Sequence, residues 1–528
     1  MPIIVSQIKC SLDMPKDSVI KKAIRLLGIP VSSVSSAEIH KTSLDARNQD
    51  NIRFVHSVYV CLNDLQKEKM LCDGNKYLSY VENSFLSPVI SSNKKDGRVV
   101  IAGFGPAGIF CGLILAENGY KPIILERGQS VDERTKAVQK FWSEGILNPQ
   151  SNVQFGEGGA GTFSDGKLTT RIKDPICRYV LERFVEFGAP QEILTKAKPH
   201  IGTDNLRGII KSIREHIEKL GGEVQFESEM TDFTEINGEI KTVQSINRDI
   251  SCSALVLAIG HSARNTFQLL SNKNIFLEPK PFSVGARIEH TQQSVEESLY
   301  GKNAGNPLLP KAEYQLSSRE KYGRAVYTFC MCPGGTVVPA ASEQCGIVTN
   351  GMSEFARDGR NANAAMVVSV TPKDFGNSPL DGVNFARQIE QKAYSLTGAY
   401  SAPATTVRGF LEHKPDITST ITPSYALGIK PIEFRNIFPS FITDMMEKGL
   451  NDFSKKMHCF GDGNAMLTAP ETRTSSPVRI TRTEQLNSVS LKNLYPCGEG
   501  AGYAGGIMSA AVDGIKVALK IMENQAPV

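Results

Sequence analysis

The most regular hydrophobic pattern of the chain begins after residue 97. Residues 98–102 form a short β-branched run typical of a buried strand, and glycines follow it at once. Apolar positions on one face then predict a helix over residues 107–118, which ends at Gly119. A second strand is predicted over residues 122–125. Strand and helix signals go on alternating to about residue 260, which predicts an α/β domain.

The residues before this domain predict a small unit of their own. Strands are predicted over residues 3–8, 34–40 and 53–61, and a helix over residues 17–27. The polar segment 91–97 is typical of a linker. Residues 1–95 are therefore expected to form an α+β module, and this pattern does not indicate its role.

Residues 281–459 follow a third pattern, with many turns. Short alternating strands are predicted over residues 283–289, 325–331 and 365–370, and helices over residues 384–396 and 439–449. We expect an inserted domain here. Residues 460–528 regain the glycine-plus-helix pattern and are expected to join residues 96–280 in one domain.

Composition narrows the class of protein. The chain has 528 residues, of which 41% are hydrophobic and 22% are charged, and this excludes a collagen-like or disordered chain. The formal net charge of +4 gives no electrostatic argument for binding nucleic acid or an anionic membrane. No apolar run approaches the ~18 residues that a membrane span needs. The apolar run at residues 3–5 is too short for the core of a secretory signal.

The cysteines indicate reduced thiols. There are 11 of them, spread from Cys10 to Cys497, and none has the paired spacing of a zinc ribbon. Cys330 and Cys332 form a C-x-C, which is strained for a disulfide, so a redox-active pair is not expected. We expect no metal site and a cytoplasmic location.

Three glycines after the first strand of the α/β domain fit a dinucleotide-binding fingerprint. Gly103, Gly105 and Gly108 match G-x-G-x-x-G. The bare pattern recurs at residues 156–161 and 500–505. Only the first match comes directly after a β-branched strand and at the beginning of a helix. It is also followed by an acidic residue at the end of a second strand.

That acid is Glu126, 18 residues after Gly108. The glycines permit the tight turn, the approach of a pyrophosphate and the close packing of the helix. Pro106 and Ala107 begin the helix, whose N–H groups and dipole favour an anion. Glu126 is expected to accept hydrogen bonds from ribose hydroxyls. Arg127 is a candidate contact to a 2′-phosphate, although the neighbouring acid disfavours one, so this unit leaves FAD and a nicotinamide dinucleotide open.

Two further segments support FAD. A strand ends in glycines near residue 498 and leads into a helix that begins near Ile507, an arrangement that resembles the closing motif of flavoproteins with two dinucleotide-binding folds. The apolar strand 255–259 ends at Gly260, which permits close approach to the pyrophosphate. The strand 223–226 leads to residues 229–231, and Met230 there is expected to line the adenine.

With these elements placed, the chain resembles the uncharacterised bacterial FAD-dependent dehydrogenases, a family of the glutathione-reductase-like class. The resemblance covers nearly the whole chain and is carried by residues 156–167, 260–264, 280–290, 330–335, 472–480 and 498–506. It implies a Rossmann-like FAD-binding domain with an inserted mixed α+β substrate domain and a small N-terminal α+β domain. Asn265 and Thr291 depart from the family pattern, which usually has Asp and Pro there, so no proton-transfer role is expected at residue 265.

The resemblance also implies positions around the flavin. It places Gly498 and Glu499 by the ribityl chain. At the start of the last helix, it places Gly505, Gly506 and Ile507 by the flavin ring. It also places along the flavin a glycine-rich loop, which contributes Gly158, Gly159, Ser164 and Lys167.

Three cations are candidates for catalysis or substrate binding. Lys167 is a candidate to face flavin N1/O2 or a substrate anion. Arg473 and Arg479 have the chemistry to clamp a carboxylate or phosphate, and salt bridges between domains are an equally good interpretation. Residues 281–459 contain no second nucleotide-binding unit, so NAD(P)H is expected at most as a transient electron donor.

These observations predict an FAD-dependent oxidoreductase that transfers a hydride between flavin N5 and a small molecule. Two alternatives stay open at this point. One is a flavoprotein of RNA modification, with residues 1–95 recruiting the RNA, and the other is a non-catalytic redox sensor. No nucleic-acid partner is expected, and the sequence indicates neither the substrate nor the oligomeric state.

Overall fold

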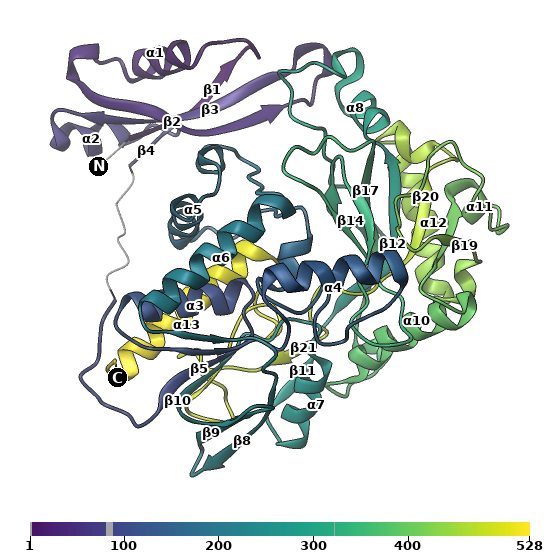
Figure 1. Cartoon of the computed structure of the whole chain (residues 1–528). Helices are drawn as coiled ribbons and strands as arrows, with labels where there is room; N and C mark the ends of the chain where they lie inside the picture. The colour runs from purple at the N-terminus through teal and green to yellow at the C-terminus, as the bar shows by residue number, and fades with distance from the viewer. Residues whose placement is uncertain (1–2, 81–87, 321–322, 528) are drawn as a thin grey trace.

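The computed structural model describes residues 3–80, 88–320 and 323–527. Figure 1 shows three units: an N-terminal sheet at the top, a sheet with long helices at the lower left, and a second large sheet on the right. We call them the N-terminal unit (residues 3–80), the first-sheet unit (98–279 and 478–527) and the second-sheet unit (282–471). This mixed architecture confirms the predicted α/β class.

The N-terminal unit is a four-stranded sheet, in the order β2-β3-β1-β4. Its elements are β1 (Ile3–Cys10), α1 (Lys16–Leu27), β2 (Val34–Asp45), β3 (Arg53–Leu62), α2 (Leu65–Cys72) and β4 (Leu78–Tyr80). Alternate residues of β1 and β3, such as Val5 and Val58, are buried together with Ala23 of α1. The predicted strands and helix are confirmed, while α2 and β4 were not predicted.

The first-sheet unit is built on five parallel strands. The order is β7 (Glu223–Gln225), β6 (Ile123–Leu125), β5 (Arg98–Ala102), β10 (Asp249–Leu257) and β22 (Leu494–Pro496). An antiparallel hairpin, β8 (Met230–Ile236) and β9 (Glu239–Ser245), extends from β10. Because parallel strands all end at one edge, the loops that follow β5, β6, β10 and β22 gather there.

Helices cover this sheet. They are α3 (Pro106–Glu117), α5 (Ile176–Glu186), α6 (Thr203–Lys219), α7 (Arg264–Asn272) and α13 (Ile507–Asn524). The remaining helix, α4 (Val131–Glu144), packs against the second-sheet unit, where Phe141 contacts Tyr400. The predicted helix after the first glycine turn is α3. It packs directly against α13, because Gly514 has no side chain and a Cβ there would overlap the carbonyl oxygen of Ala107.

The second-sheet unit contains a seven-stranded sheet. The order is β13 (Ser317–Arg319), β14 (Ala325–Cys332), β17 (Asn361–Val370), β12 (Phe282–Thr291), β20 (Met466–Glu471), β18 (Ala402–Thr406) and β19 (Ile429–Pro431). A hairpin of β15 (Thr336–Pro339) and β16 (Thr349–Met352) accompanies it. Its helices are α8 (Gln292–Tyr300), α9 (Pro372–Phe375), α10 (Asp381–Thr397), α11 (Val407–Leu411) and α12 (Ser440–Ser454).

The chain leaves and re-enters the first-sheet unit through a pair of short strands. β11 (Leu277–Pro279) pairs antiparallel with β21 (Val478–Ile480). β20 pairs with β12 and β18, so residues 466–471 lie in the second sheet, although the sequence had assigned residues 460–528 to the other domain. The domain boundaries themselves stay a prediction.

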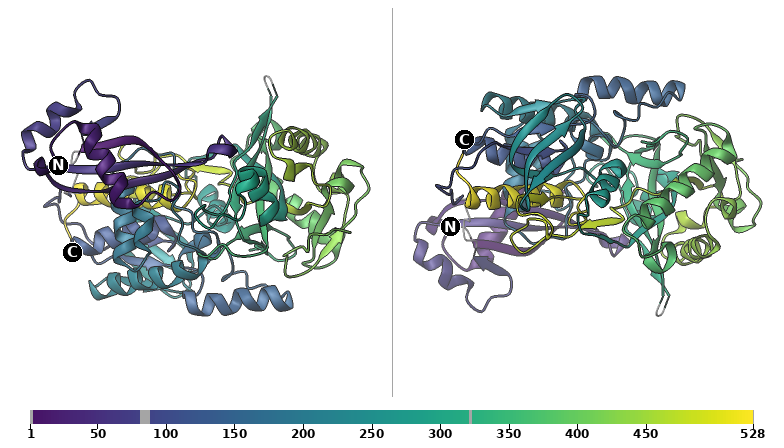
Figure 2. Two further views of the ribbon diagram at one scale, coloured as in Figure 1. Left: turned by 90° about the horizontal axis from the view of Figure 1, so that it is seen from above. Right: turned by 90° about the horizontal axis from the view of Figure 1, so that it is seen from below.

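The N-terminal unit contacts both other units. The Thr42 backbone N–H donates to the Thr195 carbonyl at 2.7 Å, and the Ala197 N–H donates to the Thr42 carbonyl at 2.8 Å. At its other end, Lys302 of the second-sheet unit pairs with Asp50 at 2.6 Å. Figure 2 shows the unit at one edge of the molecule, beside the first-sheet unit. Within the described residues, no helix has the length and apolarity to cross a membrane.

We expect Gly514→Ala to destabilise the protein, because the added methyl group would force α13 away from α3. Overpacking of this kind costs about 1–3 kcal/mol. Gly208→Ala in α6 is the matched control, since a Cβ there has open space and alanine favours a helix by about 0.5–1 kcal/mol. Urea unfolding of the two variants measures the difference, and a Gly514→Ala protein as stable as wild type would contradict the close packing.

Candidate functional site

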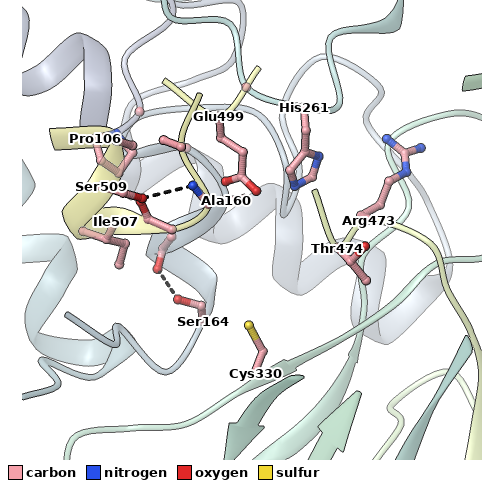
Figure 3. A pocket seen from close by; sticks show the side chains of 18 of the residues that line it. Pro106, Ala160, Ser164, His261, Cys330, Arg473, Thr474, Glu499, Ile507 and Ser509 are labelled. Carbon is pink, nitrogen blue, oxygen red and sulfur yellow. Dashed lines mark hydrogen bonds between the residues drawn. The ribbon is translucent and has the colours of Figure 1, made fainter. Parts of the chain in front are cut away.

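A cavity of about 1470 Å³ lies where the first-sheet unit meets the second. This volume exceeds the roughly 300–1,000 Å³ of a typical ligand pocket. Five stretches of chain supply most of its lining, namely residues 102–107, 154–172, 258–263, 313–332 and 499–510. Figure 3 shows side chains from several of these stretches around the central space.

The first glycine turn forms one wall of the cavity. Gly103 has a φ of 101° and Gly105 is the N-cap of α3. A Cβ on Gly105 would meet only the Cα of Gly159, at 3.7 Å, so the backbone is open to a ligand. The first N–H groups of α3 have no acceptor within the helix and carry the positive end of its dipole. This is the geometry that binds phosphate.

Most predicted residues of this turn lie where expected. Gly103, Gly105, Pro106 and Ala107 line the cavity. Gly108 lies behind them, and a Cβ there would overlap the carbonyl oxygen of Gly103. Its role is therefore close packing within the turn.

Glu126 follows β6 and connects three loops. Its Oε2 accepts the N–H of Phe104 at 2.9 Å, and its Oε1 accepts the N–H groups of Gly128 and Gly156, both at 2.9 Å. The side chain is buried yet lines the cavity. Because each carboxylate oxygen accepts more than one hydrogen bond, the predicted contact to a ribose remains compatible with this arrangement.

Arg127 and Met230 line the same end of the cavity. The Arg127 guanidinium lies over the Phe155 ring, 4.0 Å from its centroid, and pairs with Glu229 at 3.4 Å. Its charge is therefore partly neutralised, which weakens the idea of a 2′-phosphate contact.

The glycine-rich loop 156–167 packs against the first turn. A Cβ on Gly159 would lie 3.0 Å from the Cα of Gly105, so the absence of a side chain at Gly159 permits this close approach. Gly159 and Ser164 line the cavity. Gly158 does not, because it lies against Thr162 and Ile210.

Lys167 is held between the two large units. Its Nζ donates to the Met331 carbonyl and pairs with Glu313 at 3.4 Å. Asp165 of the same loop forms a two-pronged ion pair with Arg357 of the second-sheet unit. The loop and the second sheet are thus joined by charges that also border the cavity.

The predicted clamp of Arg473 and Arg479 is not formed. Arg479 is exposed, lies outside the cavity lining and has its guanidinium 5.3 Å from the Tyr503 ring. Arg473 lines the cavity, but its Nε and Nη2 donate to Glu390 of α10 at 2.9 and 3.1 Å. The alternative interpretation, a salt bridge between domains, therefore describes Arg473.

Glu390 also receives a two-pronged ion pair from Arg264, at 2.8 and 2.9 Å. Burial alone would raise its pKa, but Arg264 and Arg473 hold the pKa of this carboxyl at about 2. One buried carboxylate therefore joins α7, α10 and the segment after β20.

The last glycine cluster borders the cavity beside the first turn. A Cβ on Gly498 would lie 2.7 Å from the Cβ of Ala107. Gly505, Gly506 and Ile507 line the cavity at the N-terminus of α13, and Cβ atoms on the two glycines would have open space. Gly260 lines it as well, at the end of β10.

Glu499 faces the centre of the cavity (Figure 3). Burial raises the pKa of its carboxyl to about 7, although the charge of Lys280 acts in the opposite direction. An acid that titrates near neutrality inside a cavity is a common property of functional sites.

Two further cavity residues, His261 and Cys330, were not among the predicted site residues. His261 Nδ1 lies 2.9 Å from Ser262 Oγ, and burial, with the charges of Arg473 and Arg264, lowers its pKa to about 3. The Cys330 thiol points into the cavity (Figure 3) from a backbone with a φ of 42°. Both residues belong to recognisable sequence segments, but the sequence does not indicate that their side chains face the cavity.

Comparisons with known proteins identify relatives. A model of the family described as "FAD-dependent protein, C-terminal domain-like" matches residues 281–474, and a domain of unknown function matches residues 1–61. A Clostridium beijerinckii protein described as an uncharacterized protein is 46% identical over 531 residues, which cover 99% of each chain.

Solved structures show weaker likeness. Glycine oxidase from Bacillus cereus is 11% identical, covers 81% of this chain and 95% of its own, and has a TM-score of 0.32. L-amino acid deaminase from Proteus vulgaris is 10% identical, covers 84% and 94%, and has a TM-score of 0.35. L-proline dehydrogenase from P. horikoshii is 13% identical, covers 83% and 95%, and has a TM-score of 0.32.

We expect Glu390→Ala to destabilise the protein by about 3–5 kcal/mol, because it leaves Arg473 buried without its carboxylate. The control is Glu182→Ala in α5, which removes an exposed pair with Arg178 and should cost less than about 1 kcal/mol. Urea unfolding gives both values. Equal small losses would show that Glu390 does not hold the units together.

The raised pKa of Glu499 makes the free energy of unfolding of the protein depend on pH. Between about pH 4.3, the pKa of an unperturbed glutamate, and pH 7, the folded protein keeps a proton on Glu499 that the unfolded chain releases. Its contribution to the free energy of unfolding therefore falls as the pH rises through this window.

Replacing the residue isolates this contribution. Glu499→Gln should gain stability relative to wild type as the pH rises from about 5 to 8, measured as the difference in Tm. Glu484→Gln, at an exposed position outside the cavity, should follow wild type. A constant difference for Glu499→Gln would contradict the raised pKa.

Proposed function

The chain belongs to the protein family of its Clostridium beijerinckii relative, and on this premise we propose that it is an FAD-dependent oxidoreductase acting on a small molecule. The single observation that carries the proposal is that the N-termini of α3 and α13 open side by side onto one large cavity. Two positive helix ends suit a ligand with a pyrophosphate at one point and a ring that gains negative charge at another.

The residues present fit FAD. Gly105 leaves the backbone at the α3 N-terminus uncovered, and Gly505 and Gly506 do the same at α13. We assign the pyrophosphate to the turn 103–107 together with Gly260. The ribose is assigned to Glu126, and the adenine to the end of the cavity bordered by Arg127 and Met230.

The other end of the ligand is assigned to the second helix. Glu499, beside Gly498, is positioned for the ribityl chain. Gly159, Ser164 and the α13 N-terminus at Ile507 border the space for the ring. When bound, FAD would supply hydride transfer at N5, and the chain's own residues would bind it, orient it and exclude water.

The cavity offers room for a substrate as well. Its volume exceeds that of typical pockets, and the strand β14 with the preceding segment 313–319 forms a wall opposite the glycine turns. We propose that the substrate enters along this wall and that NAD(P)H, if it takes part, docks there transiently. The cytoplasmic location stays a prediction, and RNA modification and a non-catalytic sensor stay the two alternatives to this proposal.

The test of the proposal is the flavin content of the purified protein. We expect a flavin absorbance band and FAD as the compound released by acid, identified by mass. Gly105→Asp should fold but release no FAD, because its carboxylate would occupy and repel the pyrophosphate site while meeting no clash. Gly208→Asp, at an exposed helical glycine with open space, should keep the flavin. Flavin retained by a folded Gly105→Asp protein would refute the assignment.

A further inference from the structure

We propose that the second-sheet end of the cavity binds the anionic group of an organic acid, and that the substrate is such an acid. This deepens the proposed function and rests on it. The structure does not favour an anion site formed by Arg473 and Arg479, because Arg473 donates to Glu390 and Arg479 lies outside the cavity. Arg473 keeps only its Nη1 without a hydrogen bond among the described residues, and four further cations line another part of the cavity.

Four cations line this end of the cavity. Lys167, Arg171 and Lys198 come from the first-sheet unit, and Arg319 comes from β13 of the second-sheet unit. Arg171 and Arg319 are exposed, and neither side chain has a hydrogen bond or ion pair with any residue that the structure describes. An unpaired guanidinium at a cavity mouth is free to engage a carboxylate or phosphate.

The acids at this end do not balance the cations. Glu471 is neutralised by the buried Arg287, and Asp165 is neutralised by Arg357. Among the described acids that line this end, Glu313 alone remains, paired with Lys198 at 2.7 Å and with Lys167 at 3.4 Å. The four cations therefore face one acid, which leaves an excess of three positive charges.

The state of Glu313 reflects this excess. Burial alone would raise its pKa, but Lys167, Lys198 and Arg357 hold it at about 2. Glu313 is thus a fixed carboxylate that keeps both lysines in place across the gap between the units. An incoming anion would meet Lys167 and Lys198 already in position. Its negative charge would pair with Arg171 and Arg319, which have no ion-pair partner among the described residues.

The excess charge is not needed for the FAD phosphates. The proposed pyrophosphate site is formed by the turn 103–107 and Gly260, which contribute backbone N–H groups and a helix dipole. Figure 3 shows Pro106 of that turn and Cys330 of β14 on different walls of the cavity. The four cations belong to the wall of β14 and the loops facing it, so their charge suits a second ligand.

The same wall supplies an apolar surface. Leu316, Tyr327, Phe329 and Met331 line the cavity beside the cations. A ligand that combines one anionic group with an apolar or aromatic body matches both features. Clefts with charge of one sign also raise the rate at which oppositely charged ligands enter.

The test uses the purified full-length holoprotein and simple probes. Benzoate and phenyl phosphate are compared with benzamide and benzylamine, by calorimetry and by the shift each causes in the flavin spectrum. We expect the two anions to bind, more weakly as salt is added, and the neutral and cationic analogues not to bind. Equal binding of benzoate and benzamide would overturn the proposal.

Charge-reversal variants place the site. Arg171→Glu and Arg319→Glu remove no ion pair among the described residues, so the fold should be kept, and each should weaken benzoate binding by at least about tenfold. Lys392→Glu, on exposed helix surface in α10 and outside the lining, should bind benzoate as wild type does. Unchanged benzoate binding by both arginine variants would refute the assignment.

The failure of this inference and that of the proposed function give different results. A yellow protein that does not bind benzoate would support the proposed flavin function and contradict the anion site. Calorimetry detects benzoate without using flavin colour, so a colourless protein that binds it through Arg171 and Arg319 keeps the anion site and loses the proposed function.

Discussion

The packing of α13 on α3 is the contact on which the site depends. Gly514 removes the side chain that would separate the two helices, and Gly498 brings the last glycine cluster against Ala107. Because the two helices begin at the same edge of the parallel sheet, their positive ends share one cavity. Residues about 400 positions apart in the sequence therefore contribute to one binding surface.

Charged groups join the remaining parts around this contact. Glu126 accepts three backbone N–H groups and so fixes the loops after β5 and β6. Glu390 binds two arginines from segments that lie on either side of the inserted strands. These buried carboxylates are fully engaged, whereas the Glu499 carboxyl has no hydrogen-bond or ion-pair partner in the part of the chain that the structure describes, and it keeps its proton to a higher pH. Glu126 and Glu390 therefore stabilise the walls of the cavity, whereas the Glu499 carboxyl is available to contact a ligand.

Much of the fold could be predicted from local sequence. The strand at residues 98–102, the glycine turn and the helix after it follow from hydrophobic periodicity and from the short-range requirements of a tight turn. The placement of Gly105 and Glu126 at the cavity follows from the same pattern. The role of Gly158 did not, because its neighbours Thr162 and Ile210 decide which side of the loop faces the cavity.

Long-range partners account for what the sequence could not show. Arg473 is a plausible anion clamp until Glu390 of another helix is placed beside it, and Glu313 has no local feature that links it to Lys167 or Lys198. The assignment of β20 to the second sheet depends on strand pairing, which hydrophobic periodicity does not encode. Such properties arise only when distant segments meet.

The backbone bridge between Thr42 and the segment 195–197 has a consequence for how the protein can be divided. Lys198 lies directly beyond that bridge, at the rim of the cavity. The described residues that line the cavity all come from the two large units and the segment that joins them, and the N-terminal unit supports the rim from outside through this bridge. A fragment that begins at the linker would retain the glycine turns but would lose the strand that supports one side of the entrance.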